Sequence, residues 1–226
     1  MNLSGIGMTS QRTRQRLIER LFAKGIRDAR VMDCFMKVPR HIFVDEALGH
    51  KAYEDMAVPI GYGQTLSQPY IVARMSELVL AAPHHERILE IGTGSGFQTS
   101  VLAHLVDEIY SVERIKPLQL KARERLRLQK LYNVRLKLDD GFLGWPDAGP
   151  FDVIIGTAAP ETAPQSLLDQ LVPDGGQLIL PVGTEEQFLT VVERQGDEFT
   201  ERRIEAVRFV PMLAGIQTGD SDTLRL

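Results

Sequence analysis

A glycine-rich turn between an apolar strand pattern and a helix pattern constrains the fold of this 226-residue chain more than any other feature. The turn has the sequence ILEIGTGSG over residues 88–96, and Phe97 follows it. Glycine adopts positive φ angles and lets a ligand approach the backbone closely. Open α/β sheets bind ligands at such turns, beyond the carboxyl ends of their strands. The turn therefore predicts an α/β fold with a small-molecule site at one edge of the sheet.

The spacing of the glycines narrows the class of ligand. Gly92, Gly94 and Gly96 follow the pattern G-x-G-x-G, and Phe97 stands where a dinucleotide fingerprint needs its last glycine. A Walker phosphate loop would need a terminal Gly-Lys-Ser/Thr, which this turn lacks. These absences disfavour a pyrophosphate ligand. A plain strand-to-helix turn without a ligand is the structural alternative.

Acidic residues follow or end the strands on the same side of the predicted sheet. Glu90 lies in the strand before the turn, Glu113 comes directly after the next strand, and Asp140 with Gly141 follows the third. A carboxylate in the place of Glu113 can accept both hydroxyls of a ribose, and we expect it to be exposed. Asp140 can accept a hydrogen bond from an adenine amine. We expect Glu90, Glu113 and Asp140 to surround one small cationic cofactor, although a solvated acid and a common Asp-Gly turn are alternatives.

Strand and helix patterns alternate after residue 86. They predict strands at 87–91, 108–112, 134–138, 151–155 and 177–182, and helices at 97–106, 117–131 and 163–171. This βαβ succession predicts a mostly parallel sheet with helices on both faces. Two last strands flank Gln195-Gly196-Asp197, which predicts an antiparallel pair at one edge.

The first 82 residues have a different character. Apolar spacing predicts a helix that ends near Gly25, a second from Asp28 to before Pro39, and a third around 71–79. Residues 52–69 fit neither period, and an irregular segment of this length is typically functional. We therefore predict a single domain with three parts. These parts are a helical N-terminal extension with an active-site segment (1–82), a core (83–217) and a polar tail (218–226).

Composition excludes several classes of protein and partner. The net charge is -4, so bulk charge does not favour nucleic acid or anionic lipid. The one cysteine, Cys34, excludes an internal disulfide and a cysteine-based zinc cluster, and its helical spacing predicts a small buried apolar residue. No secretory signal or membrane-length apolar run is present. We expect a cytoplasmic monomer without metal, although the basic run at 121–130 leaves RNA open.

Several segments together resemble the protein-L-isoaspartate (D-aspartate) O-methyltransferase family. They are YGQTLSQPY at 62–70, the glycine turn at 90–96, FDVIIGTAAP at 151–160 and PDGGQLILPVG at 173–183. The resemblance extends to FVPML at 209–213 and thus covers nearly the whole chain. The glycine turn alone would indicate only a class I methyltransferase, whereas the 64–70 segment is much more specific. Phe97 departs from the pattern, because tyrosine is frequent at its position.

The resemblance implies a class I, Rossmann-like sheet and an S-adenosylmethionine-dependent enzyme. Such an enzyme methylates the carboxylate of L-isoaspartyl and D-aspartyl residues in damaged proteins, releases S-adenosylhomocysteine and needs no metal. Ser67 would then lie where the methyl group is transferred, and the 62–70 segment would form a lid. The cofactor would be bound by Glu90, Gly92, Thr93, Gly94, Ser95, Gly96, Glu113, Asp140 and Gly141. No cofactor contact is carried over to residues 217–226.

Two other functions share part of this pattern. A methyltransferase for RNA or a small molecule would have the same fold and cofactor, but it would not need the 64–70 segment. Amine-directed enzymes also often carry an Asn/Asp-Pro-Pro-aromatic segment after the 151–155 strand, and this chain has none. A non-catalytic adenosyl-binding module would keep the glycine turn and lack turnover.

Overall fold

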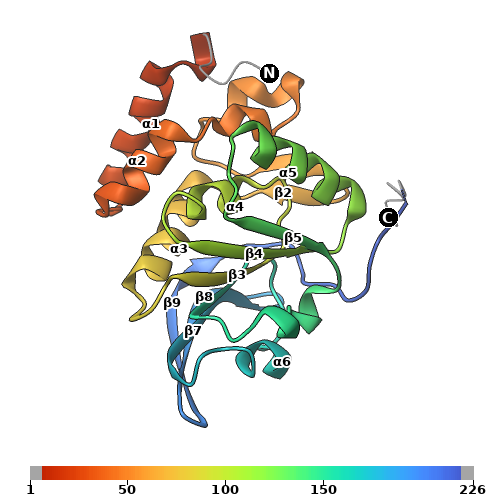
Figure 1. Ribbon diagram of the computed structural model, residues 1–226. Helices are drawn as coiled ribbons and strands as arrows, with labels where there is room; N and C mark the ends of the chain where they lie inside the picture. The colour runs from red at the N-terminus through yellow and green to blue at the C-terminus, as the bar shows by residue number, and fades with distance from the viewer. Residues whose placement is uncertain (1–6, 220–226) are drawn as a thin grey trace.

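A seven-stranded sheet forms the centre of the described part of the protein (Figure 1). The structure is a computed structural model and describes residues 7–219, without the side chain of Met8, so most of the predicted polar tail lies outside the described residues. The strand order is β5-β4-β3-β6-β7-β8-β9. The strands are β3 (Arg87–Ile91), β4 (Glu108–Glu113), β5 (Val134–Leu138), β6 (Val153–Gly156), β7 (Asp174–Gly183), β8 (Gln187–Gln195) and β9 (Glu198–Val207).

The pairing of the strands follows the predicted arrangement. Strands β3 to β7 pair in parallel, whereas β7, β8 and β9 pair antiparallel. The turn between β8 and β9 falls at Gly196-Asp197. The predicted mostly parallel sheet with an antiparallel edge is therefore confirmed.

Helices cover both faces of this sheet because successive strand residues point to opposite sides. Ile88 of β3 packs in the apolar cluster that contains α3 and α4, and its neighbour Leu89 packs in the cluster with α6. Helix α5 lies on the same side as α4, over β4 and β5 (Figure 1). These helices are α3 (Pro69–Ala81), α4 (Phe97–Leu102), α5 (Lys116–Leu128) and α6 (Gln165–Leu168).

The predicted helices 97–106, 117–131 and 163–171 are shorter in the structure than in the prediction. Helix α4 ends at Leu102, because His104 and Leu105 form tighter i→i+3 bonds that turn the chain toward β4. Helix α5 ends at Leu128, before Lys130 with its φ of 57°. Apolar spacing continues beyond the point where the backbone must turn, so it overestimates helix length.

The N-terminal extension packs α1 (Gln11–Ala23) and α2 (Ala29–Lys37) beside α3, and single turns follow at Arg40–Phe43 and Glu46–Lys51. Helix α2 begins where the sequence predicts, because the Asp28 carboxylate accepts a hydrogen bond from the Arg30 amide at 2.8 Å.

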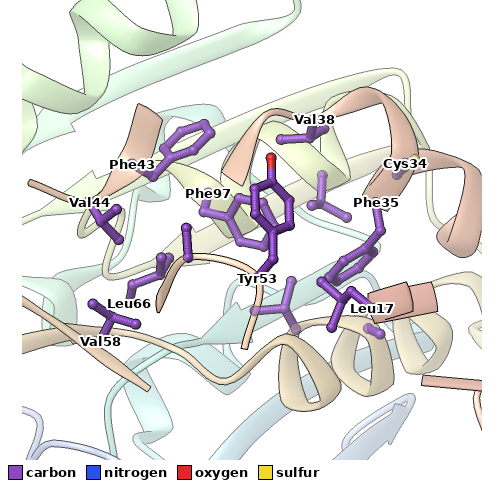
Figure 2. Packing of buried hydrophobic residues seen from close by; sticks show 14 of the residues in the cluster. Leu17, Cys34, Phe35, Val38, Phe43, Val44, Tyr53, Val58, Leu66 and Phe97 are labelled. Atoms are coloured by element: carbon purple, nitrogen blue, oxygen red, sulfur yellow. The ribbon is translucent and has the colours of Figure 1, made fainter. Parts of the chain in front are cut away.

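An aromatic cluster joins this extension to the core. Figure 2 shows Phe97 between Phe43 and Phe35, and both neighbours meet its ring edge-on, at centroid distances of 5.4 and 5.7 Å. Cys34 belongs to the same cluster and is buried, as predicted. Burial raises the pKa of the Cys34 thiol to about 11, so it is not an activated nucleophile.

The segment at 52–69 is more regular than predicted. Strands β1 (Val58–Gly61) and β2 (Gln64–Leu66) pair as an antiparallel hairpin. Tyr62 and Gly63 form its turn with φ angles of 56° and 67°, as a type I′ turn requires. The strands are too short to show a period of two, and Pro59 disfavours a strand unless it lies at an edge. The expectation of a wholly irregular segment was therefore wrong.

Candidate functional site

A pocket lies beyond the carboxyl ends of β3, β4 and β6, where an open α/β sheet binds its ligands. The glycine turn (91–95) forms one wall, and the end of the hairpin (64–67) forms a second. Residues 157–158 after β6 and residues 210–213 near the C-terminus complete it. Segments far apart in sequence thus enclose one small volume.

The glycine turn leaves its backbone open to this pocket. Gly92, Gly94 and Gly96 have φ angles of 93°, 55° and 88°, so each needs the left-handed region that glycine tolerates. A Cβ on Gly92 would lie 2.4 Å from the Thr157 hydroxyl oxygen. That hydroxyl donates to the Gly92 carbonyl at 2.6 Å and holds the turn against β6. The positive φ angles that the glycine-rich sequence permits are therefore present at all three positions.

Predicted cofactor residues divide into two groups in the structure. Some line the pocket, and others do not. The lining group comprises Gly92, Thr93, Gly94, Ser95 and Gly141. Glu90, Gly96, Glu113 and Asp140 are not lining residues; a Cβ on Gly96 would sit 3.2 Å from the Ala122 side chain of α5. Gly96 therefore permits close packing of the helix rather than access for a ligand.

Glu113 is buried, which corrects the expectation of an exposed acid at the end of a strand. Its Oε2 accepts a hydrogen bond from the Gly94 amide at 2.7 Å, and its Oε1 accepts one from the Ile115 amide at 2.8 Å. Burial raises the pKa of this carboxyl, while the amide hydrogen bonds oppose the shift. Glu113 thus shapes the glycine turn directly, and each oxygen keeps a second lone pair for a ligand.

Glu90 is fully buried beneath the turn. Its Oε2 accepts hydrogen bonds from the hydroxyls of Thr99 and Ser111, both at 2.5 Å. Ser111 is in turn 2.6 Å from the Thr93 hydroxyl, which reaches the pocket wall. Burial raises the pKa of Glu90 to about 7. Glu90 does not line the pocket. A chain of hydrogen bonds through Ser111 and Thr93 connects its carboxylate to the pocket wall.

The Asp140 carboxylate binds the backbone of two segments near the pocket, one directly after β5 and one near the C-terminus. Its Oδ1 accepts a hydrogen bond from the Phe142 amide at 2.9 Å, and its Oδ2 accepts one from the Gly215 amide at 2.6 Å. Gly141 beside it lines the pocket, where a Cβ would lie 2.7 Å from the Ile91 side chain. The Asp-Gly pair therefore connects the end of β5 to the C-terminal segment.

Sequence reasoning missed part of the pocket wall. We call residues 210–217 the C-terminal strap, because this segment crosses the strand ends and contributes residues 210–213 to the lining. The Ala159 amide donates to the Val210 carbonyl at 2.8 Å, and the Lys116 amide donates to the Gln217 carbonyl at 2.9 Å. The FVPML segment signalled resemblance but no role. Gln98, Arg114, Ile115, Thr157 and Ala158 also line the pocket without having been predicted.

Ser67 lies at a junction of two hollows. It lines the pocket and also a neighbouring hollow formed by the start of α3 and residues 206–210. No hydrogen bond occupies its hydroxyl among the described residues. Ser67 does not cap helix α3, because Gln68 is the N-cap residue of α3 and the Asp55 carboxylate accepts from the Tyr70 amide at 2.9 Å. The Ser67 hydroxyl is thus available to a ligand.

Comparison with known families decides the identity. The family model described as Protein-L-isoaspartate(D-aspartate) O-methyltransferase matches residues 11–217. The chain belongs to this family. Its members are S-adenosylmethionine-dependent enzymes that methylate isoaspartyl residues of damaged proteins, so the function predicted from the 64–70 segment is confirmed.

Relatives of this methyltransferase match along nearly their whole length. A protein-L-isoaspartate O-methyltransferase 1 from Marinobacter nauticus is 60% identical over 215 residues, which are 95% of this chain and 97% of the relative. A protein-L-isoaspartate O-methyltransferase from Saccharophagus degradans is 55% identical over 219 residues, 96% of this chain and 98% of the relative.

Solved structures show the same fold as this methyltransferase. A protein-L-isoaspartate O-methyltransferase superposes with a TM-score of 0.80 at 25% identity, covering 90% of this chain and 67% of that one. A putative enzyme of the same name from Plasmodium falciparum, solved with S-adenosyl-L-homocysteine, gives a TM-score of 0.76 at 24% identity, covering 88% and 98%. The predicted class I methyltransferase sheet is confirmed.

The described part of this methyltransferase shows neither a metal-binding cluster nor a helix that could span a membrane. No group of three or more His, Cys, Asp or Glu residues within 7–219 is arranged to hold a metal ion. None of the helices described there is long and apolar enough to cross a membrane.

Proposed function

We propose that the pocket binds S-adenosylmethionine and that Ser67 binds the acceptor carboxylate of an isoaspartyl residue. The position of Ser67 carries this proposal: its free hydroxyl stands where the cofactor pocket and the neighbouring hollow meet. A methyl group must pass from one bound molecule to another at such a junction. The cofactor supplies that methyl group on a sulfonium centre.

The residues around the pocket suit such a cofactor. Glycines at 92, 94 and 141 leave backbone surface where side chains would collide with neighbours or need strained angles. Glu90 and Glu113 lie behind the glycine turn, which favours a cation over a pyrophosphate. We assign the ribose hydroxyls to Glu113 and the adenine side to the Asp140-Gly141 pair. Glu90 acts on the pocket through Ser111 and Thr93.

The acceptor needs no general base. A carboxyl group with a reference pKa of about 3.9 is already ionised at neutral pH. The Ser67 hydroxyl donates a hydrogen bond to one carboxylate oxygen and leaves the other to attack the methyl carbon. Orientation of this kind can contribute about 7–11 kcal/mol. The hairpin helps to exclude water, since Ile60 packs near Gly94 of the turn.

The hollow beside Ser67 offers a place for the polypeptide substrate. Residues 206–210 and the start of α3 line it, and Arg208 is its one charged lining residue among those described. We assign this hollow to an extended loop or terminus of a damaged protein. The methyl ester formed there is expected to collapse to a succinimide. We further propose that the enzyme works as a cytoplasmic monomer without nucleic acid.

Labelled methyl transfer to an isoaspartyl peptide and to its aspartyl twin tests this function. We expect label on the isoaspartyl peptide alone. Ser67→Ala should lower turnover about tenfold or more, because a hydrogen bond to a charged group contributes about 1.5–3 kcal/mol. Its cofactor affinity should change less than about twofold, since Ser67 contacts the acceptor. Ser166→Ala, in the exposed start of α6, is the matched control.

Four outcomes would contradict the proposal. Equal labelling of both peptides, or label on RNA alone, would reject the substrate. Cofactor binding without turnover on any isoaspartyl peptide would indicate a non-catalytic adenosyl-binding module. A Ser67→Ala variant that loses only cofactor affinity would place Ser67 in the cofactor site instead.

A further inference from the structure

Arg40 is a buried cation that the chemistry above does not use. Its side chain is 1% exposed, and it forms no ion pair with any described residue. One of its guanidinium nitrogens, Nη1, is buried without a hydrogen-bond partner. Burial lowers the pKa of Arg40 to about 9, so the side chain is still charged at neutral pH. A buried charge without a carboxylate partner is costly, so stability alone does not explain this residue.

The other two nitrogens of Arg40 bind carbonyls that precede and follow the β1–β2 hairpin in the chain. Nε donates to the Ala52 carbonyl at 2.7 Å, before the hairpin, and Nη2 donates to the Ser67 carbonyl at 2.7 Å, after it. The planar fork of arginine holds both carbonyls in one geometry, which lysine cannot reproduce. The hairpin that covers Gly94 is therefore closed at its base by one side chain.

Arg40 also contacts the element that follows the glycine turn. Its guanidinium carbon lies 4.6 Å from the centroid of the Phe97 ring, within range of a cation–π interaction. Phe97 is the first residue of α4 and the centre of the aromatic cluster in Figure 2. The same guanidinium thus touches the hairpin base and the start of the helix behind the cofactor turn.

A second buried arginine has a parallel arrangement on the other wall. Arg125 of α5 donates from Nη1 to the Ser95 carbonyl at 3.2 Å, and its guanidinium carbon lies 5.9 Å from the Phe43 ring centroid. Phe43 packs edge-on against Phe97. Arg40 and Arg125 each donate a hydrogen bond to a carbonyl of a different pocket wall. Their guanidinium groups also contact the rings of the Phe97–Phe43 pair.

We propose that Arg40 is a positioning residue that sets the place of Ser67 relative to the cofactor turn. It acts through the Ser67 main chain and never touches the substrate, and the proposal rests on the function proposed for Ser67. Rigid support of this kind matters because a small misplacement of a reacting group has a large effect on rate. We call the two hydrogen bonds from Arg40 to the Ala52 and Ser67 carbonyls the Arg40 clamp. Without this clamp, β1 and β2 would still pair, but the hairpin would no longer be held at a fixed distance from the glycine turn.

The test compares Arg40→Lys and Arg40→Met with two matched variants of Arg14. Arg14 is also a buried arginine of the N-terminal extension, and neither arginine lines the pocket. The Arg14 Nη1 donates to the Met36 carbonyl at 2.9 Å, whereas Arg40 donates to the Ser67 carbonyl. We expect Arg40→Met to lower kcat/KM for an isoaspartyl peptide about tenfold or more, with Arg40→Lys intermediate. Cofactor Kd should change less than about twofold. The Arg14 variants should lose melting temperature but keep kcat/KM within about twofold.

A double-mutant cycle with Ser67→Ala separates positioning from general destabilisation. If Arg40 acts through Ser67, Arg40→Met should reduce the rate of the Ser67→Ala enzyme far less than it reduces the parent rate. Ser67→Ala should keep its full effect when combined with Arg14→Met. Amide exchange of residues 58–66, measured without cofactor, should accelerate in Arg40→Met and not in Arg14→Met.

Each other outcome rejects a specific statement. Rate losses that multiply in the cycle, or a parallel loss of cofactor affinity, would overturn the positioning role while leaving the function of Ser67 intact. Unchanged amide exchange of residues 58–66 in both Arg40 variants would show that Arg40 does not hold the base of the hairpin. Normal turnover of Ser67→Ala would reject the function proposed for Ser67. It would also remove the residue through which Arg40 is proposed to act.

Discussion

Glu90 and Glu113 are both buried beside the pocket, yet the surrounding groups satisfy their carboxylates differently. Glu113 receives a main-chain amide on each oxygen, which stabilises its charged form. Glu90 receives two hydroxyls on one oxygen, while its Oε1 has no partner among the described residues. The pKa of Glu90 therefore rises to about 7, with burial as the main cause. Ionisation of Glu90 in the folded protein therefore opposes folding.

We predict that Glu90→Gln reduces the pH dependence of stability. Because the folded pKa is raised from 4.5 to about 7, the stabilising contribution of Glu90 is fully present below pH 4.5 and is lost as pH rises through 7. Glutamine is neutral throughout, so its advantage over the parent should be largest near pH 8, on the order of 1–3 kcal/mol in the free energy of unfolding. Urea denaturation at several pH values between about 5 and 8 measures this difference.

Glu108→Gln is the opposite control for this experiment. Hydrogen bonds from Arg135 and Arg87 lower the pKa of Glu108, so its contribution is present at neutral pH and is lost as pH falls through the lowered pKa. This variant should therefore lose stability relative to the parent near neutral pH. Identical pH slopes in Glu90→Gln and the parent would show that Glu90 is ionised normally in the folded protein.

At the scale of elements, the pocket is assembled by the hairpin and the C-terminal strap. Arg40 closes the base of the hairpin, as described above. The strap is attached at three places along the sheet edge: Ala159 after β6, Asp140 after β5, and Arg114 and Lys116 after β4. The Asp140 attachment uses its side chain and the others are backbone hydrogen bonds. Because they are spread over the ends of three strands, the strap and the sheet hold each other in place.

We predict that Asp140→Asn loosens the strap and weakens cofactor binding. The asparagine oxygen can still cap the Phe142 amide, but its NH₂ group would face the Gly215 amide, donor against donor. We expect cofactor affinity to fall about five- to tenfold by calorimetry, and amide exchange of Gly215 to accelerate. Asp139→Asn is the neighbouring control. A loss of affinity with unchanged exchange at Gly215 would instead mean that Asp140 contacts the cofactor only directly.

At the scale of the whole molecule, two hollows meet at Ser67 near the strand ends of the mostly parallel sheet. Described lining residues of these hollows include no histidine. His41, in the N-terminal extension, pairs its Nδ1 with the Tyr53 hydroxyl at 2.9 Å. Nothing that lines the junction is arranged to remove a proton, which agrees with an acceptor that is already ionised.

We therefore predict that single-turnover methyl transfer at saturating cofactor is nearly flat between about pH 6 and 8. The rate should fall only toward the carboxyl pKa of about 3.9. Acid quenching is needed, because the product ester is lost faster as pH rises. Glu90→Gln serves as the control, since Glu90 titrates in the same range. A tenfold rise with a midpoint near 6.5 that persists in this variant would contradict the mechanism.

Local patterns in the sequence were enough to predict the sheet, its antiparallel edge and the glycine turn. Strand alternation and glycine conformation act over a few residues, so they can be read without tertiary contacts. The resemblance of the 64–70 segment to the family, and not a local pattern, predicted the role of Ser67 in methyl transfer. That role stays a prediction, although Ser67 does line the pocket. The ends of the helices and the short β1–β2 hairpin were less predictable. The position at which the backbone turns depends on the segments packed against it, which a local sequence pattern does not contain.

Only the tertiary structure decided how the pocket is closed. The burial of Glu113 depends on the Gly94 amide 19 residues away, and the clamp of Arg40 depends on a carbonyl 27 residues away. The Asp140–Gly215 bond joins residues 75 positions apart. Such long-range contacts produce no repeating pattern of residue types in the sequence. Each of these residues is a common type at its position, so nothing local marks its partner. They arise when the chain packs, since buried polar groups must then find partners wherever the fold brings them.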